Sequence, residues 1–173
     1  MAVRFEGFPR VLERSALRAG RWFVATGGRG AALCFMTDLG MGAARTVFTF
    51  RTTKLDGLDF MPVQLAELPG TLTTVEDDLV IAPGEGAKTA RLHAPGKRPF
   101  LSGSLLRLKN GDLGIGYADR SGGELILVSL TSGGRVEGFE LVFDRWSLSL
   151  RRGDAETLIG CFRPSLTMSA AGR

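Results

Sequence analysis

The feature that most constrains the fold is a series of short apolar runs separated by tight-turn residues, which occupies positions 105–150. Glycine, asparagine and aspartate recur between the runs, and these residues supply the positive φ angles or self-capping side chains that tight turns need. The last two runs alternate cleanly, so that one face carries Phe139, Leu141, Phe143, Trp146, Leu148 and Leu150, and the other carries Glu140, Ser147, Ser149 and Arg151. We therefore predict an antiparallel meander with one buried and one solvated face.

The rest of the chain follows the same strand-and-turn pattern. Residues 3–8 alternate like a first strand, we assign residues 11–18 to another strand, and no segment offers a helix of ten or more residues. The sequence thus predicts an all-β fold of about a dozen short antiparallel strands, arranged as a two-sheet sandwich or a barrel-like double sheet. Trp22 and Trp146 are expected in its core, each needing a partner for its indole N–H.

Two segments of the chain resemble each other. Residues 17–50 and residues 108–143 share the order of strand, glycine turn, strand, glycine turn and phenylalanine-bearing strand. This similarity is either an internal duplication or two meanders that share only a general pattern. We divide the chain into a first meander (1–54), an acidic connecting segment (55–98), a second meander (99–163) and a flexible tail (164–173), together forming one compact unit.

Local signals refine this division. Pro62 predicts an edge strand or a bulge, because proline cannot donate a hydrogen bond to a sheet. Cys34 and Cys161 sit in apolar strand patterns typical of buried free thiols. No run is long and apolar enough to span a membrane, and charged residues occupy the N-terminal segment where a signal peptide would be uncharged, so we expect a cytoplasmic protein.

Charge is segregated along the sequence. Residues 1–54 carry nine basic and three acidic side chains, residues 55–87 none and seven, and residues 88–173 thirteen and eight. Acidic loops that pack against basic strands of the same molecule, or that simply face solvent, would explain this pattern. The alternative explanation is a pair of complementary surfaces that lets copies of the chain or a partner dock.

Few residues point to catalysis or metal binding. His93 is the single histidine of the chain, so neither a histidine-based triad nor a multi-histidine metal site can be assembled. Residues 84–89 lack the glycines of a phosphate-binding loop, and residues 76–78 form a carboxylate-rich turn without the ligand spacing of a calcium site. Arg152-Gly153-Asp154 is interpreted as the tip of the last hairpin. We assign no catalytic residue, no metal site and no cofactor.

Arginine is the residue type that stands out. There are eighteen arginines and four lysines, and the candidate ligand-binding residues are Arg10, Arg14, Arg18 and Arg21 near the N-terminus. Guanidinium groups bind phosphate bidentately and stack on bases, which favours an anion or nucleotide site. A GC-rich genome, which raises arginine, alanine and glycine together, is the alternative explanation.

Two motifs resemble those of PilZ domains. Arg10 and Arg14 have the R-x-x-x-R spacing by which these domains hold a cyclic dinucleotide, and residues 119–123 are similar to their D-x-S-x-x-G turn. The glycine comes one residue early, with Glu124 in its place, and the two motifs lie far apart in the sequence. The resemblance implies a cyclic dinucleotide as ligand.

Three hypotheses for function follow. The first is a non-catalytic module that acts by binding or assembly, with a protein partner or self-association, and without membrane or nucleic acid. The second is a nucleotide- or anion-binding module that uses the N-terminal arginines for an anionic small molecule. The third is an enzyme whose carboxylate pair is brought together only by the fold.

Overall fold

The chain folds into three antiparallel sheets, which confirms the all-β prediction. The structure is a computed structural model that describes residues 10–28, 30–85, 88–89, 102–118 and 124–163. The predicted strand 3–8, His93, the turn 119–123 and the tail 164–173 lie outside the described residues. The described strands are arranged in three sheets where the sequence predicted two, and none of these sheets closes into a barrel.

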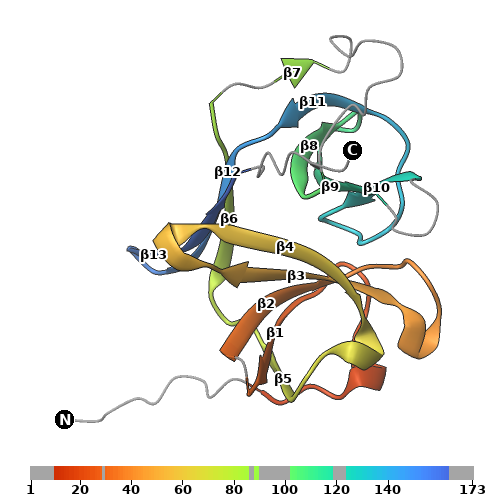
Figure 1. Cartoon of the computed structure of the whole chain (residues 1–173), viewed down its shortest axis with the longest axis vertical. Helices are drawn as coiled ribbons and strands as arrows, with labels where there is room; N and C mark the ends of the chain where they lie inside the picture. Colours follow the sequence, from red (N-terminus) through yellow and green to blue (C-terminus); the bar gives the residue numbers. More distant parts are fainter. Residues whose placement is uncertain (1–9, 29, 86–87, 90–101, 119–123, 164–173) are drawn as a thin grey trace, which may run out of the picture.

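The N-terminal and C-terminal halves of the chain each form a five-stranded sheet, and a third, bridging sheet takes strands from both halves (Figure 1). The N-terminal sheet has the order β4 (Leu58–Gln64), β3 (Thr46–Thr52), β2 (Gly30–Met36), β1 (Trp22–Gly27) and β5 (Thr71–Thr74). The C-terminal sheet has the order β10 (Leu125–Ser129), β9 (Leu113–Ala118), β8 (Ser104–Leu108), β11 (Phe139–Phe143) and β7 (Lys88–Thr89). The bridging sheet contains β13 (Ala155–Phe162), β12 (Trp146–Arg152) and β6 (Asp78–Pro83). Four short 3₁₀ turns complete the described elements: η1 (Arg14–Ala16), η2 (Gly42–Ala44), η3 (Lys54–Asp56) and η4 (Leu65–Glu67).

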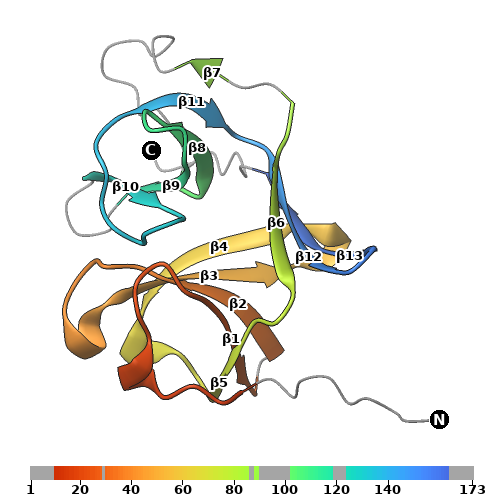
Figure 2. The ribbon, with the colours of Figure 1, turned by 180° about the vertical axis from the view of Figure 1, so that it is seen from behind.

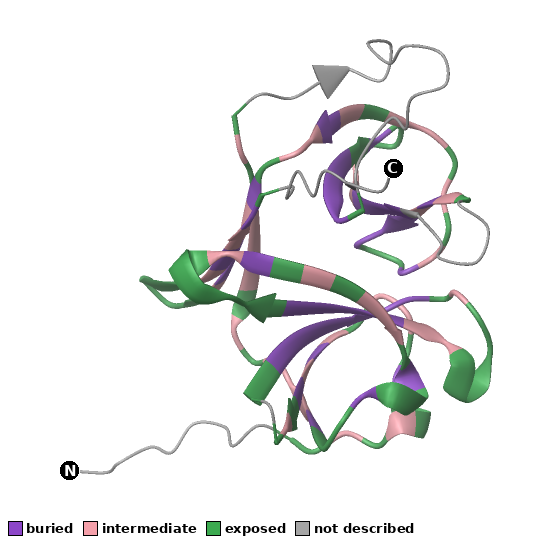
Figure 3. Ribbon diagram, viewed as in Figure 1, coloured by how far each residue is buried: buried purple, intermediate pink, exposed green. Residues whose placement is uncertain are grey.

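The bridging sheet lies between the other two, and Figure 2 shows β6 and β12 side by side from the opposite view. Its strands come from two distant parts of the sequence, because β6 follows the N-terminal sheet and β12 follows β11. The main hydrophobic core accordingly draws from all three sheets: it includes Phe35, Phe48 and Phe50 of the N-terminal sheet, Leu105, Ile115 and Val128 of the C-terminal sheet, and Trp146, Leu148 and Phe162 of the bridging sheet. Figure 3 shows this buried region where the sheets meet.

The N-terminal sheet is buried on both faces. Phe35, Phe48 and Phe50 point to the main core, while Phe23 and Cys34 point the other way into a second cluster. Leu65 and Leu68 help to close that second cluster. This two-sided burial explains why the sequence of β2 is a nearly continuous apolar run.

Pro62, whose nitrogen carries no hydrogen, lies in an edge strand, as its chemistry predicts. Pro62 lies in β4, where it faces Phe48 of β3, and β4 is an edge strand of its sheet. The proline therefore costs no ladder hydrogen bond on the sheet's interior side. The prediction made from Pro62 is confirmed.

Three local predictions are wrong. Residues 11–18 were expected to form a strand, but Arg14–Ala16 form η1 and a single bridge joins Val11 to Thr73. The residues of this segment favour helix locally, and the single bridge to Thr73 does not hold them in a strand. The Ala16 N–H instead donates to the Glu13 carbonyl oxygen. The second prediction is the continuous meander over 105–150: β11 pairs with β8 instead of β10, so the chain crosses back after β10.

The third wrong prediction is the solvated face of the last two strands. Val142 is 1% exposed because it packs with Leu106 and Leu108, and Ser149 is buried as well. β11 and β12 carry packed residues on both faces, so alternation in the sequence did not report exposure here. Both tryptophans, as predicted, contact the main core, although Trp22 is only partly buried.

Candidate functional site

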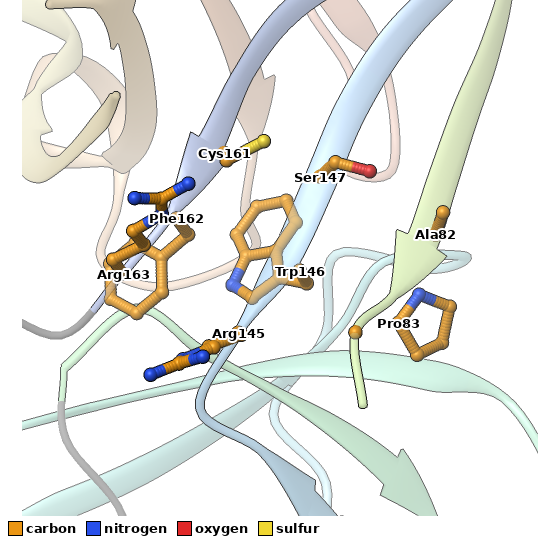
Figure 4. A pocket seen from close by; sticks show the side chains of 9 residues that line it. Ala82, Pro83, Arg145, Trp146, Ser147, Cys161, Phe162 and Arg163 are labelled. Carbon is orange, nitrogen blue, oxygen red and sulfur yellow. The ribbon is translucent and has the colours of Figure 1, made fainter. Parts of the chain in front are cut away.

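One pocket of the described structure gathers charged, polar and aromatic residues from all three strands of the bridging sheet. It has a volume of about 400 Å³ and lies at the end of the sheet where β6 and β13 finish and β12 begins. Its lining consists of Ala82, Pro83, Gly84, Arg145, Trp146, Ser147, Cys161, Phe162 and Arg163, and we call it the Trp146 pocket (Figure 4).

The strand register sets the positions of the polar lining residues. Ser147 stands opposite Cys161 of β13 and Ala82 of β6. Residues two positions apart on a strand share a face, so Arg145 lies on the face of Ser147, and Arg163 on the face of Cys161. The register ends at the pair of Trp146 with Phe162, with Arg145 immediately before β12 and Arg163 immediately after β13.

The aromatic part of the pocket is held rigidly. Trp146 is 2% exposed, and its indole Nε1 donates a hydrogen bond of 2.9 Å to the carbonyl oxygen of Gly103. Its ring stacks on Phe162 at a centroid distance of 5.7 Å and an interplanar angle of 26°. The backbone positions of the neighbouring lining residues, Arg145, Ser147, Cys161 and Arg163, are therefore fixed by the packing of Trp146 and Phe162.

Arg145 and Arg163 are both exposed, and Figure 4 shows them on one side of the Trp146 ring, with Ala82 and Pro83 on the other. No hydrogen bond or ion pair joins either guanidinium group to a residue in the described part of the chain. Other arginines have carboxylate partners: Arg107 pairs with Glu140, Arg135 with Glu124, Arg151 with Glu156 and Arg152 with Asp77. Two like charges that line one pocket repel each other, which makes this pocket a preferred place for an anion.

Gly84 keeps the mouth of the pocket open. Its N–H donates to the Arg145 carbonyl oxygen at 2.8 Å, which continues the pairing of β6 and β12 by one position. A Cβ atom at this position would lie 2.7 Å from the same oxygen and 3.1 Å from the Arg145 Cβ. A side chain at Gly84 would displace Arg145, so the glycine allows the ends of β6 and β12 to lie close together at the pocket.

The arginines predicted from the sequence lie elsewhere. Arg10, Arg18 and Arg21 are exposed, and the Arg10 backbone pairs with Thr74. Arg14 is half-buried, and its two terminal nitrogens donate to the carbonyl oxygens of Leu65 in η4 and of Leu68 just after it, each at 2.5 Å.

Arg14 also lines a second pocket, of about 390 Å³, whose other cation is Arg45. Arg45 donates to the carbonyls of Gly42 and Leu17, at 3.2 and 3.1 Å. Both arginines therefore tie backbone segments together, and the lining of this pocket does not include the other three predicted arginines. None of the four predicted arginines lines the Trp146 pocket.

The two cysteines are free thiols in different environments. Cys34 is fully buried, and this burial raises the pKa of its thiol to about 12. Cys161 is partly exposed and lines the Trp146 pocket. The carboxylate-rich turn holds one ion pair, between Asp77 and Arg152, and no group of His, Cys, Asp or Glu within the described ranges could hold a metal ion.

Comparisons with known protein families, with characterised proteins and with solved structures find no match to this chain. Among the described residues, no helix is both long enough and apolar enough to cross a membrane.

Proposed function

We propose that this protein is a non-catalytic binding module that holds an anionic group in the Trp146 pocket. The observation that supports the proposal is the pair of arginines that line one pocket, with Arg145 immediately before β12 and Arg163 immediately after β13. An anion between them would relieve their mutual repulsion and accept charge-assisted hydrogen bonds from both guanidinium groups. The Ser147 hydroxyl offers a further donor on the same face.

The composition of the lining favours binding over chemistry. A serine or cysteine nucleophile needs an adjacent base, and none of the nine lining residues is a histidine or a carboxylate. Arginine stays protonated in proteins and cannot take up a proton from a reacting group. The pocket as lined can therefore position and neutralise an anion, and it offers no histidine or carboxylate for acid–base catalysis.

The proposal is tested by calorimetric titration with inorganic phosphate and pyrophosphate at low ionic strength. Each hydrogen bond to a charged group contributes about 1.5–3 kcal/mol, so Arg145→Gln or Arg163→Gln should weaken binding roughly tenfold or more. Arg107→Gln is the matched control, because that arginine is exposed but paired with Glu140 on another sheet. Equal weakening by all three substitutions, or no binding of either probe by the wild type, would contradict the proposal.

A nucleotide site near the N-terminal arginines is the second candidate. Its support is that Arg14 and Arg45 line one pocket whose other lining residues are Ser15, Gly42, Ala43, Leu65 and Ala66. Thermal stabilisation by a cyclic dinucleotide that is lost in the variant Arg10→Ala with Arg14→Ala, and retained in Arg145→Gln with Arg163→Gln, would favour this candidate. Stabilisation lost only in the second variant would assign the nucleotide to the Trp146 pocket.

A further inference from the structure

The bridging sheet carries opposite charges at its two ends. One end is the Trp146 pocket with its two arginines, and the other is the carboxylate-rich turn at the start of β6. A shallow pocket of about 270 Å³ lies at this second end, lined by Glu76, Asp77, Asp78, Arg151, Arg152 and Gly153. We call residues 76–78 the acidic turn.

The acidic end keeps excess negative charge after its internal ion pairs are formed. Arg152 pairs with Asp77, and Arg151 pairs with Glu156 of the neighbouring strand. Five carboxylates stand against these two arginines when Asp154 of the hairpin tip is included. Glu76 and Asp78 are exposed, and neither forms an ion pair with a residue in the described ranges.

The two ends cannot neutralise each other within one molecule. Six residues separate Asp78 from Gly84 along β6, which at about 3.3 Å per residue of strand corresponds to roughly 20 Å. That distance is beyond the reach of an arginine and a carboxylate side chain together. The remaining way to pair the acidic turn with the two arginines is between two molecules.

We infer that the anion bound by the Trp146 pocket is the acidic turn of a second copy of this chain, with Glu76 and Asp78 placed against Arg145 and Arg163. This inference rests on the function proposed above and names its partner. The contact joins two different surfaces, so it is head-to-tail: a pair of copies still has one unused pocket, on one copy, and one unused acidic turn, on the other. Such a contact extends into open chains unless its rotation closes a ring.

Salt should control the assembly because its contacts are charged and exposed. The Debye length falls from about 30 Å at 0.01 M salt to about 3 Å at 1 M, so attraction between the surfaces is largely screened at high salt. We expect light scattering coupled to size exclusion to give a mass above the monomer at 20 mM salt, and the monomer mass at 1 M salt. A wild-type protein that is monomeric at 20 mM salt at high protein concentration would overturn the inference.

Complementary variants test the head-to-tail geometry. The pocket variant carries Arg145→Gln and Arg163→Gln, and the turn variant carries Glu76→Gln and Asp78→Asn. Each variant alone should be monomeric, because one half of every contact is missing. An equimolar mixture should form a dimer that grows no further, since the intact acidic turn of the first fits the intact pocket of the second. Oligomers in either variant alone, or no dimer in the mixture, would overturn the inference.

The matched control is Arg107→Gln with Glu140→Gln, which removes an exposed ion pair from the C-terminal sheet and should leave the wild-type mass distribution unchanged. Phosphate titration separates the two proposals. If the wild type binds phosphate through Arg145 and Arg163 but never associates, the binding function stands and the second-copy partner fails. If neither phosphate nor a second copy binds, both proposals fail.

Discussion

Replacing Trp146 by phenylalanine should destabilise the fold more than any comparable change at Trp22. Trp146 belongs to β12 of the bridging sheet, donates its indole N–H to Gly103 just before β8, and contacts Phe50 of β3 edge-on at 5.9 Å. One side chain thus connects all three sheets. The substitution leaves the buried Gly103 carbonyl without this donor and leaves part of the indole volume empty.

The magnitude follows from these two losses. An unsatisfied buried acceptor costs about 1–3 kcal/mol, and the lost ring volume adds about 1 kcal/mol of packing. We therefore expect Trp146→Phe to lower the free energy of unfolding by about 2–4 kcal/mol. Trp22 is only partly buried and packs on Phe35 at 4.8 Å, so Trp22→Phe should cost about 1 kcal/mol.

Urea unfolding at 25 °C, followed by far-UV circular dichroism, measures both values without relying on tryptophan fluorescence. With a slope of about 2 kcal/mol per molar urea, the midpoint of Trp146→Phe should fall by about 1–2 M and that of Trp22→Phe by about 0.5 M. The transition should stay single, because the main core is shared by the three sheets. Equal midpoint shifts for the two variants would refute the assignment of Trp146 as the residue that joins the sheets.

Three further predictions concern backbone fit, arginine packing and thiol titration. Gly70→Ala should cost more than Gly111→Ala in urea unfolding: both glycines have positive φ angles of 68° and 88°, but a Cβ at Gly70 would collide with a strand carbonyl, whereas Gly111 has open space. Arg14→Met should lower the free energy of unfolding by about 2 kcal/mol, because two carbonyl oxygens lose their charged donor. Iodoacetamide should label Cys161 but not Cys34 in the folded protein, as read by mass spectrometry. Burial raises the pKa of Cys34 from 9.0 to about 12, so the folded state retains a proton that the unfolded state loses above pH 9. Relative to Cys34→Ala, the free energy of unfolding should therefore fall by about 1.4 kcal/mol per pH unit between these values; parallel pH profiles would contradict it.

The sequence was most informative about local chemistry. Pro62 marked an edge strand, and the Arg152-Gly153-Asp154 turn marked the tip of a hairpin, where Gly153 has a φ of 58°. These features depend on the φ angle and hydrogen-bonding capacity of single residues, which the sequence states directly. The all-β class followed from many such signals taken together.

Pairing beyond neighbouring strands was not predictable in the same way. The alternation of apolar and polar residues in β11 predicted one buried face, yet Val142 on the opposite face is also buried, against Leu106 and Leu108. After β10, the next strand, β11, pairs with β8 at the opposite edge of the first three strands. No single residue of the sequence specifies which of the two edges β11 joins. The main core likewise includes residues of the bridging sheet, whose strands are far apart in the sequence.

The candidate site shows this division most clearly. Counting back from the hairpin tip, where Arg152 pairs with Ala155, would place Arg145 opposite Phe162. A bulge between Leu148 and Ser149 of the register adds Ile159 to β13 and shifts the pairing by one position. The Ile159 carbonyl accepts a hydrogen bond of 2.6 Å from the Thr52 hydroxyl, a contact across 107 residues of sequence. The turn residues of the sequence mark the β12–β13 hairpin by themselves. The register beyond the bulge, which brings Cys161 opposite Ser147 and places Arg145 and Arg163 beside one pocket, is visible only in the folded protein, because a one-residue slip reverses every side chain's face and the bulge lies where β13 contacts the N-terminal sheet.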